Sequence, residues 1–282
     1  MLRRRELLLG SGGVAASLAG CLGPGDGDGD SRQTQGELLV AVTTSTYDAG
    51  LLGKLHEECE RRFGVTLRTI SGGTGENLRR GEAGDVDVVM AHAPGLEAEF
   101  VHDGYGVDRH RFADGDFVVA GPPDDPAGIG GVEEAAVAFE RIADENAPFL
   151  SRGDGSGTHI AERRVWEDAG IEPRGEWYQE SGQGMGGTLV QAGQYGAYLL
   201  TVRANHLDVR PRVDLTSFVE GPLTGGDPIL DNPYSVIAVD PSRHPGVEYE
   251  LAMLYIGFLT GPTGRELIEE FEIDGEQPFV PP

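Results

Sequence analysis

From Glu37 onward, short apolar runs alternate with segments that have the spacing of amphipathic helices. The run ELLVAVTT predicts a strand, Asp48 to Phe63 predicts a helix with one apolar face, and VTLRTIS predicts the next strand. Strands that alternate with helices indicate a parallel sheet covered by helices on both faces. The sequence therefore predicts an α/β fold with a mainly parallel sheet flanked by helices.

The alternation continues to the carboxyl terminus without an internal repeat. Further strands are predicted at 85–92, 116–122, 147–151, 195–201 and 232–240, and further helices at 75–82, 94–102, 131–145, 158–169, after 182–188, and at 247–259 and 263–271. In such sheets, ligands bind beyond the carboxyl ends of the strands, where each strand gives way to a helix. We therefore expect the functional residues at those junctions.

The amino terminus is predicted to be a targeting segment and not part of the fold. Residues 1–20 combine arginines with a short apolar run and are interpreted as a twin-arginine-like export signal peptide. They lead into LAGC, which resembles a lipobox, so Cys21 is predicted to carry lipid; cleavage without lipidation is the alternative. Residues 21–36 form a Gly/Asp-rich flexible linker. The chain is therefore expected to be extracytoplasmic and lipid-anchored to the outer face of the cell membrane.

The charge balance is strongly acidic. The chain has 22 basic and 47 acidic residues, and Lys54 is its only lysine. Such a surface is typical of a halophilic protein, and it argues against nucleic acid as a partner because phosphate binding needs basic clusters. It would also repel an anionic ligand, but at molar salt the screening length falls to ~3 Å, so only local donors matter.

The segment Ser151 to Glu162, SRGDGSGTHIAE, places an arginine and two hydroxyls directly before a predicted helix. Helix N-termini expose unpaired N–H groups and favour anions, and Arg152 adds a fixed cation with planar donors. Ser156 and Thr158 add hydroxyl donors. An oxyanion site is the functional interpretation, and an ordinary helix N-cap is the alternative. Similar glycine- and hydroxyl-rich junctions occur at 43–50, 71–77 and 182–188, and none has the nucleotide P-loop pattern.

Other chemistry has less support in the sequence. With Cys21 lipidated, Cys59 has no partner for an intramolecular disulfide and is expected to be a half-buried helix residue. The seven histidines are scattered, so no metal site is predicted, and His92 is interpreted as a hydrogen-bonded turn residue. A hydrolase that uses Ser156 and His159 is a distant alternative, because no nucleophile elbow surrounds the serine. No catalytic residue, and no enzyme activity, is expected.

Several blocks occur together in one order. They are VTTSTYDAGLL (42–52), GTGENL (73–78), GDVDVVMAHAP (84–94), DFVVAGPPDDPAGI (116–129), SRGDGSGTH (151–159), ESGQGMGGTL (180–189) and NPYSVIAV (232–239). Through them the chain resembles the solute-binding proteins of ABC importers for tungstate, over essentially all of 38–282. It departs from the family pattern at Val42, Ala49 and Gly155, where the family has threonine, serine and aspartate.

The resemblance implies a two-lobe type II periplasmic-binding fold with a ligand cleft between the lobes, one of 37–120 with 216–282 and the other of 121–215. It implies a tungstate site made by Thr44, Ser45, Thr74, Gly75, Arg152, Ser156 and Thr158. Asp154 is expected to hold Arg152 or to cap its helix. The partners implied are an ABC permease and its ATPase, with the receptor itself monomeric and without a cofactor.

Molybdate and phosphate remain alternative ligands. Phosphate-binding relatives carry a similar Arg-x-x-x-Ser-Gly-Thr element, here Arg152 to Thr158. They also place an aspartate in the turn after the third strand to accept the phosphate proton, and the corresponding turn here, Ala91 to Pro94, has none. This difference favours tungstate or molybdate, both of which are unprotonated dianions.

Overall fold

The computed structural model describes residues 36–282, and the structural statements below refer to these residues. The predicted export signal, the lipidated Cys21 and the linker lie outside them, except that Gly36 begins the first strand. None of the described helices is long and apolar enough to cross a membrane.

The strands, in chain order, are β1 (Gly36–Thr43), β2 (Val65–Gly72), β3 (Val88–Ala91), β4 (His110–Gly121), β5 (Phe149–Ser151), β6 (Tyr178–Glu180), β7 (Leu199–Val202), β8 (Thr216–Val219), β9 (Asp231–Ala238) and β10 (Phe279–Val280). The α-helices are α1 (Thr44–Asp48), α2 (Leu51–Phe63), α3 (Thr74–Ala83), α4 (Pro94–His102), α5 (Ala135–Asp144), α6 (Gly157–Asp168), α7 (Met185–Tyr195), α8 (Arg203–Val209), α9 (Tyr249–Thr260) and α10 (Pro262–Glu269). Two 3₁₀ turns, η1 (Pro222–Thr224) and η2 (Pro228–Leu230), precede β9.

The main sheet has the order β10-β4-β9-β3-β1-β2, with β7 and β8 also paired to β4. The predicted α/β fold is confirmed, but the sheet is mixed. β1 pairs in parallel with β2 and β3, whereas β9 runs antiparallel to both β3 and β4. The expectation of a mainly parallel sheet is therefore wrong for β4 and its neighbours, because β9 returns through the sheet in the opposite direction.

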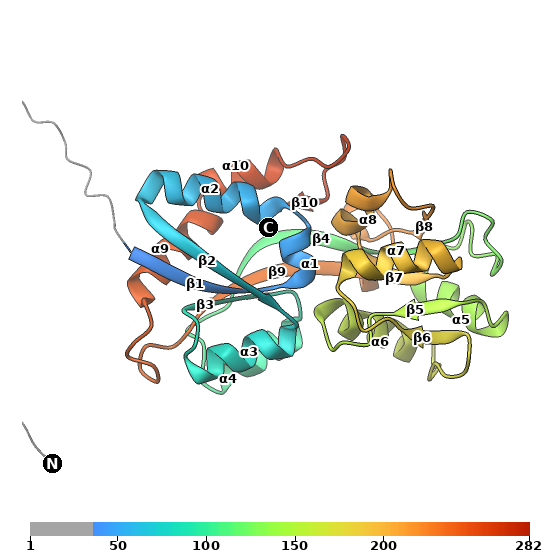
Figure 1. Ribbon diagram of the computed structural model, residues 1–282, viewed down its shortest axis with the longest axis horizontal. Helices are drawn as coiled ribbons and strands as arrows, with labels where there is room; N and C mark the ends of the chain where they lie inside the picture. The colour runs from blue at the N-terminus through green and yellow to red at the C-terminus, as the bar shows by residue number, and fades with distance from the viewer. Residues whose placement is uncertain (1–35) are drawn as a thin grey trace, which may run out of the picture. The chain divides into compact units, whose positions relative to one another are not determined.

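The central strands of this sheet, β1, β3 and β9, are largely buried on both faces. Val40 and Val42 of β1 belong to the core cluster that includes Leu55 of α2. Ala41, which points to the opposite face, belongs to the cluster that includes Phe100 of α4. Accordingly α2, α9 and α10 cover one face and α3 and α4 cover the other (Figure 1).

β4 connects two groups of elements. Its first part, up to Asp116, pairs with β9, and its last residues, from Phe117 to Gly121, pair with β7 and β8 (Figure 1). Asp116 is fully buried at the change of partner, where its Oδ2 accepts a hydrogen bond from Leu223 N at 3.0 Å. The residue boundaries predicted for the lobes stay a prediction. The prediction places β8 in the lobe of 37–120 and 216–282, whereas β8 pairs with the same end of β4 as β7 does.

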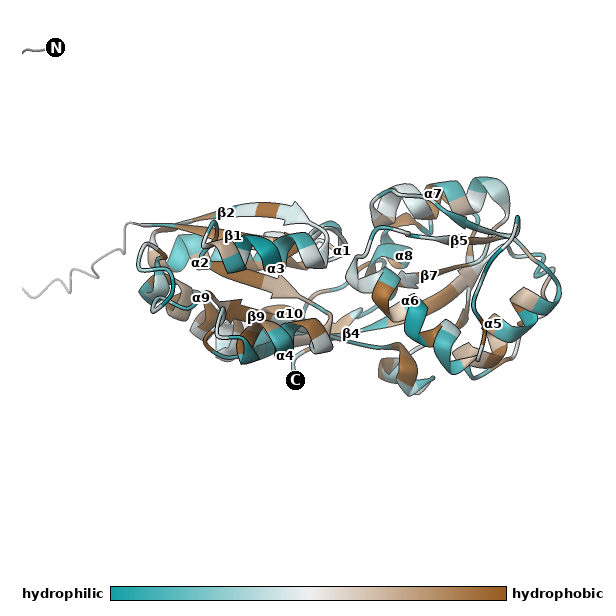
Figure 2. Cartoon of the chain, turned by 90° about the horizontal axis from the view of Figure 1, so that it is seen from below, coloured by the Kyte–Doolittle hydropathy of each residue, from teal (hydrophilic) through white to brown (hydrophobic). Residues whose placement is uncertain are grey.

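The helices around β5 and β7 enclose an aromatic core. Trp166 of α6 is fully buried, and its ring lies 4.3 Å from that of Phe139 and 5.1 Å from that of Phe149 between centroids. Figure 2 shows hydrophobic segments in the strands and on the helix faces turned towards them. These aromatic residues therefore stabilise the fold. Cys59 is also fully buried, more than expected, and burial raises the pKa of its thiol to about 12, which keeps it protonated.

Candidate functional site

The predicted site residues lie where strands end and helices begin. Thr44 begins α1 directly after β1, Thr74 begins α3 shortly after β2, and Ser156 is the N-cap of α6 after β5. The carboxyl ends of the parallel strands β1 and β2 meet at one edge of the sheet because Thr43 pairs with Gly72. Thr44 and Thr74, from separate junctions, therefore lie at the same edge.

Arg152 is the cation at this site. The residue is 2% exposed, although arginine is rarely buried without a full set of partners. Nη2 donates to Oγ1 of Thr44 at 3.3 Å and also contacts the carboxylate of Asp154. Nε and Nη1 are buried and have no hydrogen-bond partner within residues 36–282. A buried guanidinium with two free donors is a strong binding group for an oxyanion.

Two threonine hydroxyls at the site are also buried without a hydrogen-bond partner among the described residues. Oγ1 of Thr74 and Oγ1 of Thr158 are both buried, and neither has a partner in the described part of the chain. A Cβ placed on Gly73 would lie 3.8 Å from the carbonyl oxygen of Asp154, so the start of α3 approaches the loop that carries Arg152. Unpaired buried polar groups cost free energy, and donors from separate segments that remain unpaired indicate a polar ligand.

Asp154 holds Arg152, as the sequence analysis expected of it. Its Oδ2 contacts Nη2 of Arg152, and its Oδ1 accepts from Ser156 N at 3.1 Å. Burial alone would raise the pKa of Asp154, but the hydrogen bonds from Ser156 and the charge of Arg152 lower it below its ordinary value. The carboxylate is thus ionised, and its oxygens are engaged by Arg152 and Ser156. It leaves Nε and Nη1 of the guanidinium available to a ligand.

Three predicted residues are engaged elsewhere. The hydroxyl of Ser45 lies 2.9 Å from Nε2 of His92. The hydroxyl of Ser156 accepts from His159 N at 3.4 Å and caps α6. Gly75 lines a different groove, with Leu78, on the side of α3 that contacts α4. Their assignment to the ligand site stays a prediction, and the backbone N–H of Ser156 also has a partner, because it donates to Asp154.

Asn232 was missed by sequence reasoning. His92 is confirmed as a hydrogen-bonded turn residue, because its two ring nitrogens lie 2.9 Å from Ser45 Oγ and 2.8 Å from Asn232 Oδ1. Asn232 is fully buried at the start of β9, far from His92 in sequence. The only signal was its place in the block NPYSVIAV, which does not indicate a contact with the β3–α4 loop.

The hydrolase alternative has no catalytic pair. Nδ1 of His159 accepts a hydrogen bond from Gly155 N at 3.0 Å, and Ser156 Oγ accepts from the backbone of His159, not from its ring. A serine nucleophile needs a base within reach of its own proton. Within residues 36–282 there is also no cluster of three or more His, Cys, Asp or Glu residues that could hold a metal ion.

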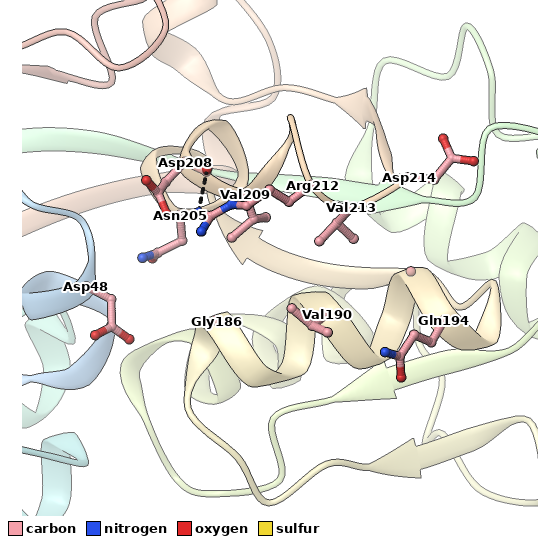
Figure 3. Close-up of a pocket in the computed structure, with 11 residues that line it drawn as sticks. Asp48, Gly186, Val190, Gln194, Asn205, Asp208, Val209, Arg212, Val213 and Asp214 are labelled. Atoms are coloured by element: carbon pink, nitrogen blue, oxygen red, sulfur yellow. Dashed lines mark hydrogen bonds and ion pairs between the residues drawn. The ribbon is translucent and has the colours of Figure 1, made fainter.

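A separate hollow has a different chemistry. It has a volume of about 650 Å³ and lies between α7 and α8, with Asp48 of α1 at its edge (Figure 3). Asp208 and Asp214 also line it, and none of the seven predicted site residues does. Burial, with Asp208 nearby, raises the pKa of Asp48, while Arg152 lowers it. Three carboxylates would repel a dianion, so size alone does not locate an oxyanion site.

Comparison with known proteins agrees with this geometry. A model of the PBP superfamily domain matches residues 28–263, and the chain therefore belongs to that superfamily. A protein of Haloferax volcanii, provisionally named an ABC transporter anion-binding protein, is 49% identical, over 99% of this chain and 85% of its own.

Two further similarities carry a more specific name. Tungstate-binding protein TupA of Peptoclostridium acidaminophilum is 33% identical, over 92% of this chain and 90% of its own. A crystal structure described as the tungstate ABC transporter from Geobacter sulfurreducens superposes with a TM-score of 0.76 and 44% identity, over 83% of this chain and 98% of that one. The two-lobe periplasmic-binding fold is thus confirmed. These relatives are named for binding and transport.

Proposed function

We propose that this protein captures tungstate and delivers it to the permease of an ABC importer. The observation that carries the proposal is a set of buried donors without a partner among residues 36–282: Nε and Nη1 of Arg152 and the hydroxyls of Thr74 and Thr158. The names of the relatives in Peptoclostridium and Geobacter support tungstate as the ligand.

Tungstate suits these donors because it is a fully deprotonated tetrahedral dianion that accepts hydrogen bonds and donates none. Arg152 supplies two charge-assisted bonds, and the hydroxyls supply neutral ones. The nearest carboxylate, Asp154, is taken up by Arg152 and by the backbone of Ser156. A protonated phosphate would need an acceptor for its proton, which this donor set does not offer. Molybdate has the same shape and charge as tungstate, and we propose that the same donors bind it.

Release would follow from the way the site is assembled. Thr44 and Thr74 follow β1 and β2, which belong to the same sheet as the first part of β4. Arg152 and Thr158 follow β5, which lies among the elements around β7, and β7 pairs with the last part of β4. Among the described strands, β4 therefore connects these two groups of elements. We propose that β4 and the return segment before β9 act as the hinge. When the permease and its ATPase move these two groups of elements apart, Arg152 and Thr158 separate from Thr44 and Thr74. The anion then loses most of its contacts.

The place of capture is also part of the proposal. An extracytoplasmic receptor works outside the membrane, and the predicted lipid on Cys21 would hold this one to the outer face, with residues 21–36 as a tether. The charge balance, 22 basic against 47 acidic residues, suits a compartment of high salt, where screening removes the long-range repulsion of the ligand.

Isothermal titration tests the proposal. The unit from Gln33 to Pro282, which is compact by itself, is titrated with tungstate, molybdate, phosphate and sulfate in buffer of high salt concentration. Tight one-to-one binding of tungstate, with phosphate at least about a thousandfold weaker, is expected. That ratio is about 4 kcal/mol of discrimination. Phosphate binding without tungstate binding would reject the ligand, and no binding of any oxyanion by folded protein would reject the function.

A further inference from the structure

His92 is fixed beside the proposed anion site. It lies between β3 and α4, is 3% exposed, and stacks on Tyr234 with the ring centroids 5.3 Å apart. A Cβ on Gly157, the first residue of α6, would lie only 2.7 Å from the ring, so the start of α6 packs directly against it. The ring therefore contacts both the helix that carries Thr158 and, through Nε2, the helix that begins at Thr44.

The hydrogen bonds around the ring define where its proton is. Nδ2 of Asn232 donates to the hydroxyl of Tyr234 at 2.8 Å, so Oδ1 of Asn232 faces His92. An amide oxygen can only accept, and Nδ1 of His92 must therefore carry the proton. In the neutral ring Nε2 then has a lone pair, so the hydroxyl of Ser45, 2.9 Å away, donates to it.

The same contact has the opposite polarity when His92 is charged. A protonated ring has N–H groups at both positions, so Nε2 donates to Ser45 Oγ and Ser45 can direct its own proton elsewhere. Ser45 directly follows Thr44, whose hydroxyl contacts Arg152. The released proton would be one more donor for an oxyanion on Arg152, and Oγ1 of Thr43, 3.4 Å from Ser45 Oγ, is the acceptor in the described residues that competes for it.

We propose that His92 is a positioning residue for Ser45, drawing the serine proton away from the oxyanion when neutral and releasing it to the oxyanion when charged, so that capture takes up a proton. One proton moves from solvent to Nε2, and no bond between heavy atoms changes. The inference rests on the proposed function, because it needs an oxyanion at Arg152.

The surrounding charges give the direction of the effect. Burial lowers the pKa of His92 to about 4; the hydrogen bond with Asn232 opposes this shift and the charge of Arg152 adds to it. A dianion on Arg152 outweighs that positive charge, and so raises the pKa of His92 in the complex. The other charged groups that share the hollow beside the ring are Glu99 of α4, Arg164 of α6 and Asp231 of β9. Because these are present with and without ligand, the difference between the two states comes from the anion.

The test is the pH dependence of binding, measured by titration calorimetry on Gln33–Pro282 between pH 5.5 and pH 8, with micromolar tungstate and molybdate. If the anion raises the pKa of His92 by about two units, affinity should be about fourfold higher at pH 5.5 than at pH 7.5. Titrations in buffers of different ionisation enthalpy should show proton uptake at the lower pH. His92→Gln, which cannot titrate, should bind at pH 7.5 but lose the uptake.

His56 provides the matched control. It is half-buried in α2, desolvation also lowers its pKa to about 4, and it contacts Tyr255 and not Ser45. His56→Gln should keep the wild-type proton uptake. A nitrogen NMR spectrum of wild-type protein gives a reading that needs no variant: the Nδ1–H tautomer of His92 when free, and a charged ring in the complex at pH 5.5.

The outcomes separate the inference from the function on which it rests. Wild-type binding that is independent of pH, or a His92 ring that stays neutral in the complex, overturns the role of His92 and leaves oxyanion capture intact. Uptake that persists in His92→Gln overturns it as well. Absence of binding at every pH rejects the proposed function itself.

Discussion

Replacing Arg152 with alanine should remove most of the affinity for the oxyanion. Two of its donors, Nε and Nη1, are buried without a partner in the described residues and are the ones available to a ligand. A hydrogen bond that involves a charged group contributes about 1.5–3 kcal/mol. The loss of two such bonds gives about 3–6 kcal/mol, which is a factor of about 100 to 10,000 in the dissociation constant.

Titration calorimetry at neutral pH and high salt measures this loss, with two matched variants beside it. Arg152→Lys keeps the charge but not the planar set of donors, and should fall between wild type and Arg152→Ala. Arg141→Ala removes an exposed arginine that donates to the carbonyl of Gly128, and should bind like wild type. Thermal unfolding without ligand checks that each variant is folded. A folded Arg152→Ala protein that binds within threefold of wild type would refute the site.

Two further changes test other parts of the structure. Thr158→Val removes one neutral donor at nearly constant volume. Because a neutral hydrogen bond contributes about 0.5–1.5 kcal/mol, this variant should bind the oxyanion about 2- to 12-fold more weakly. Thr260→Val is the control, because the hydroxyl of Thr260 donates within α9, and it should not change binding. Burial raises the pKa of Asp116 to about 7, so the native state holds this proton more tightly than the unfolded chain does. Stability should therefore fall as pH rises from about 4 to about 7. Asp116→Asn should flatten that decline, and urea unfolding at pH 5 and pH 8 that shows the same decline in both proteins would contradict this assignment.

Much of the fold could be predicted because local pattern decides it. The helix predicted at 94–102 has the observed bounds, since a proline starts it. The helix predicted at 48–63 is divided at Gly50, whose positive φ of 82° ends α1 before α2 begins. The sequence does not predict the start of β4, because HRFADG carries charges and a glycine and becomes a strand through its pairing with β9 and β10.

For the candidate site, residue types could be predicted but not their partners. Arginine and hydroxyl residues at strand–helix junctions indicated an anion, and Arg152, Thr74 and Thr158 are indeed buried with unpartnered donors. The N-cap that the sequence offered as the alternative for this segment is present at Ser156, three residues before His159, because a cap is a local feature. The sequence could not show that Ser45 contacts His92, because these residues come from segments that are far apart in the chain and no local spacing contains the distance between them.

The position of β9 has a consequence for how the chain is made. β9 lies between β3 and β4, so the sheet that begins at Gly36 has no central strand until residue 231 has left the ribosome. Until then β3 presents an unpaired edge of the kind that promotes aggregation. The elements around β5 to β7 come from one continuous stretch and can assemble earlier. The elements around β5 to β7 should thus fold first, and a nascent chain that stops before β9 should be held by chaperones or lost to aggregation.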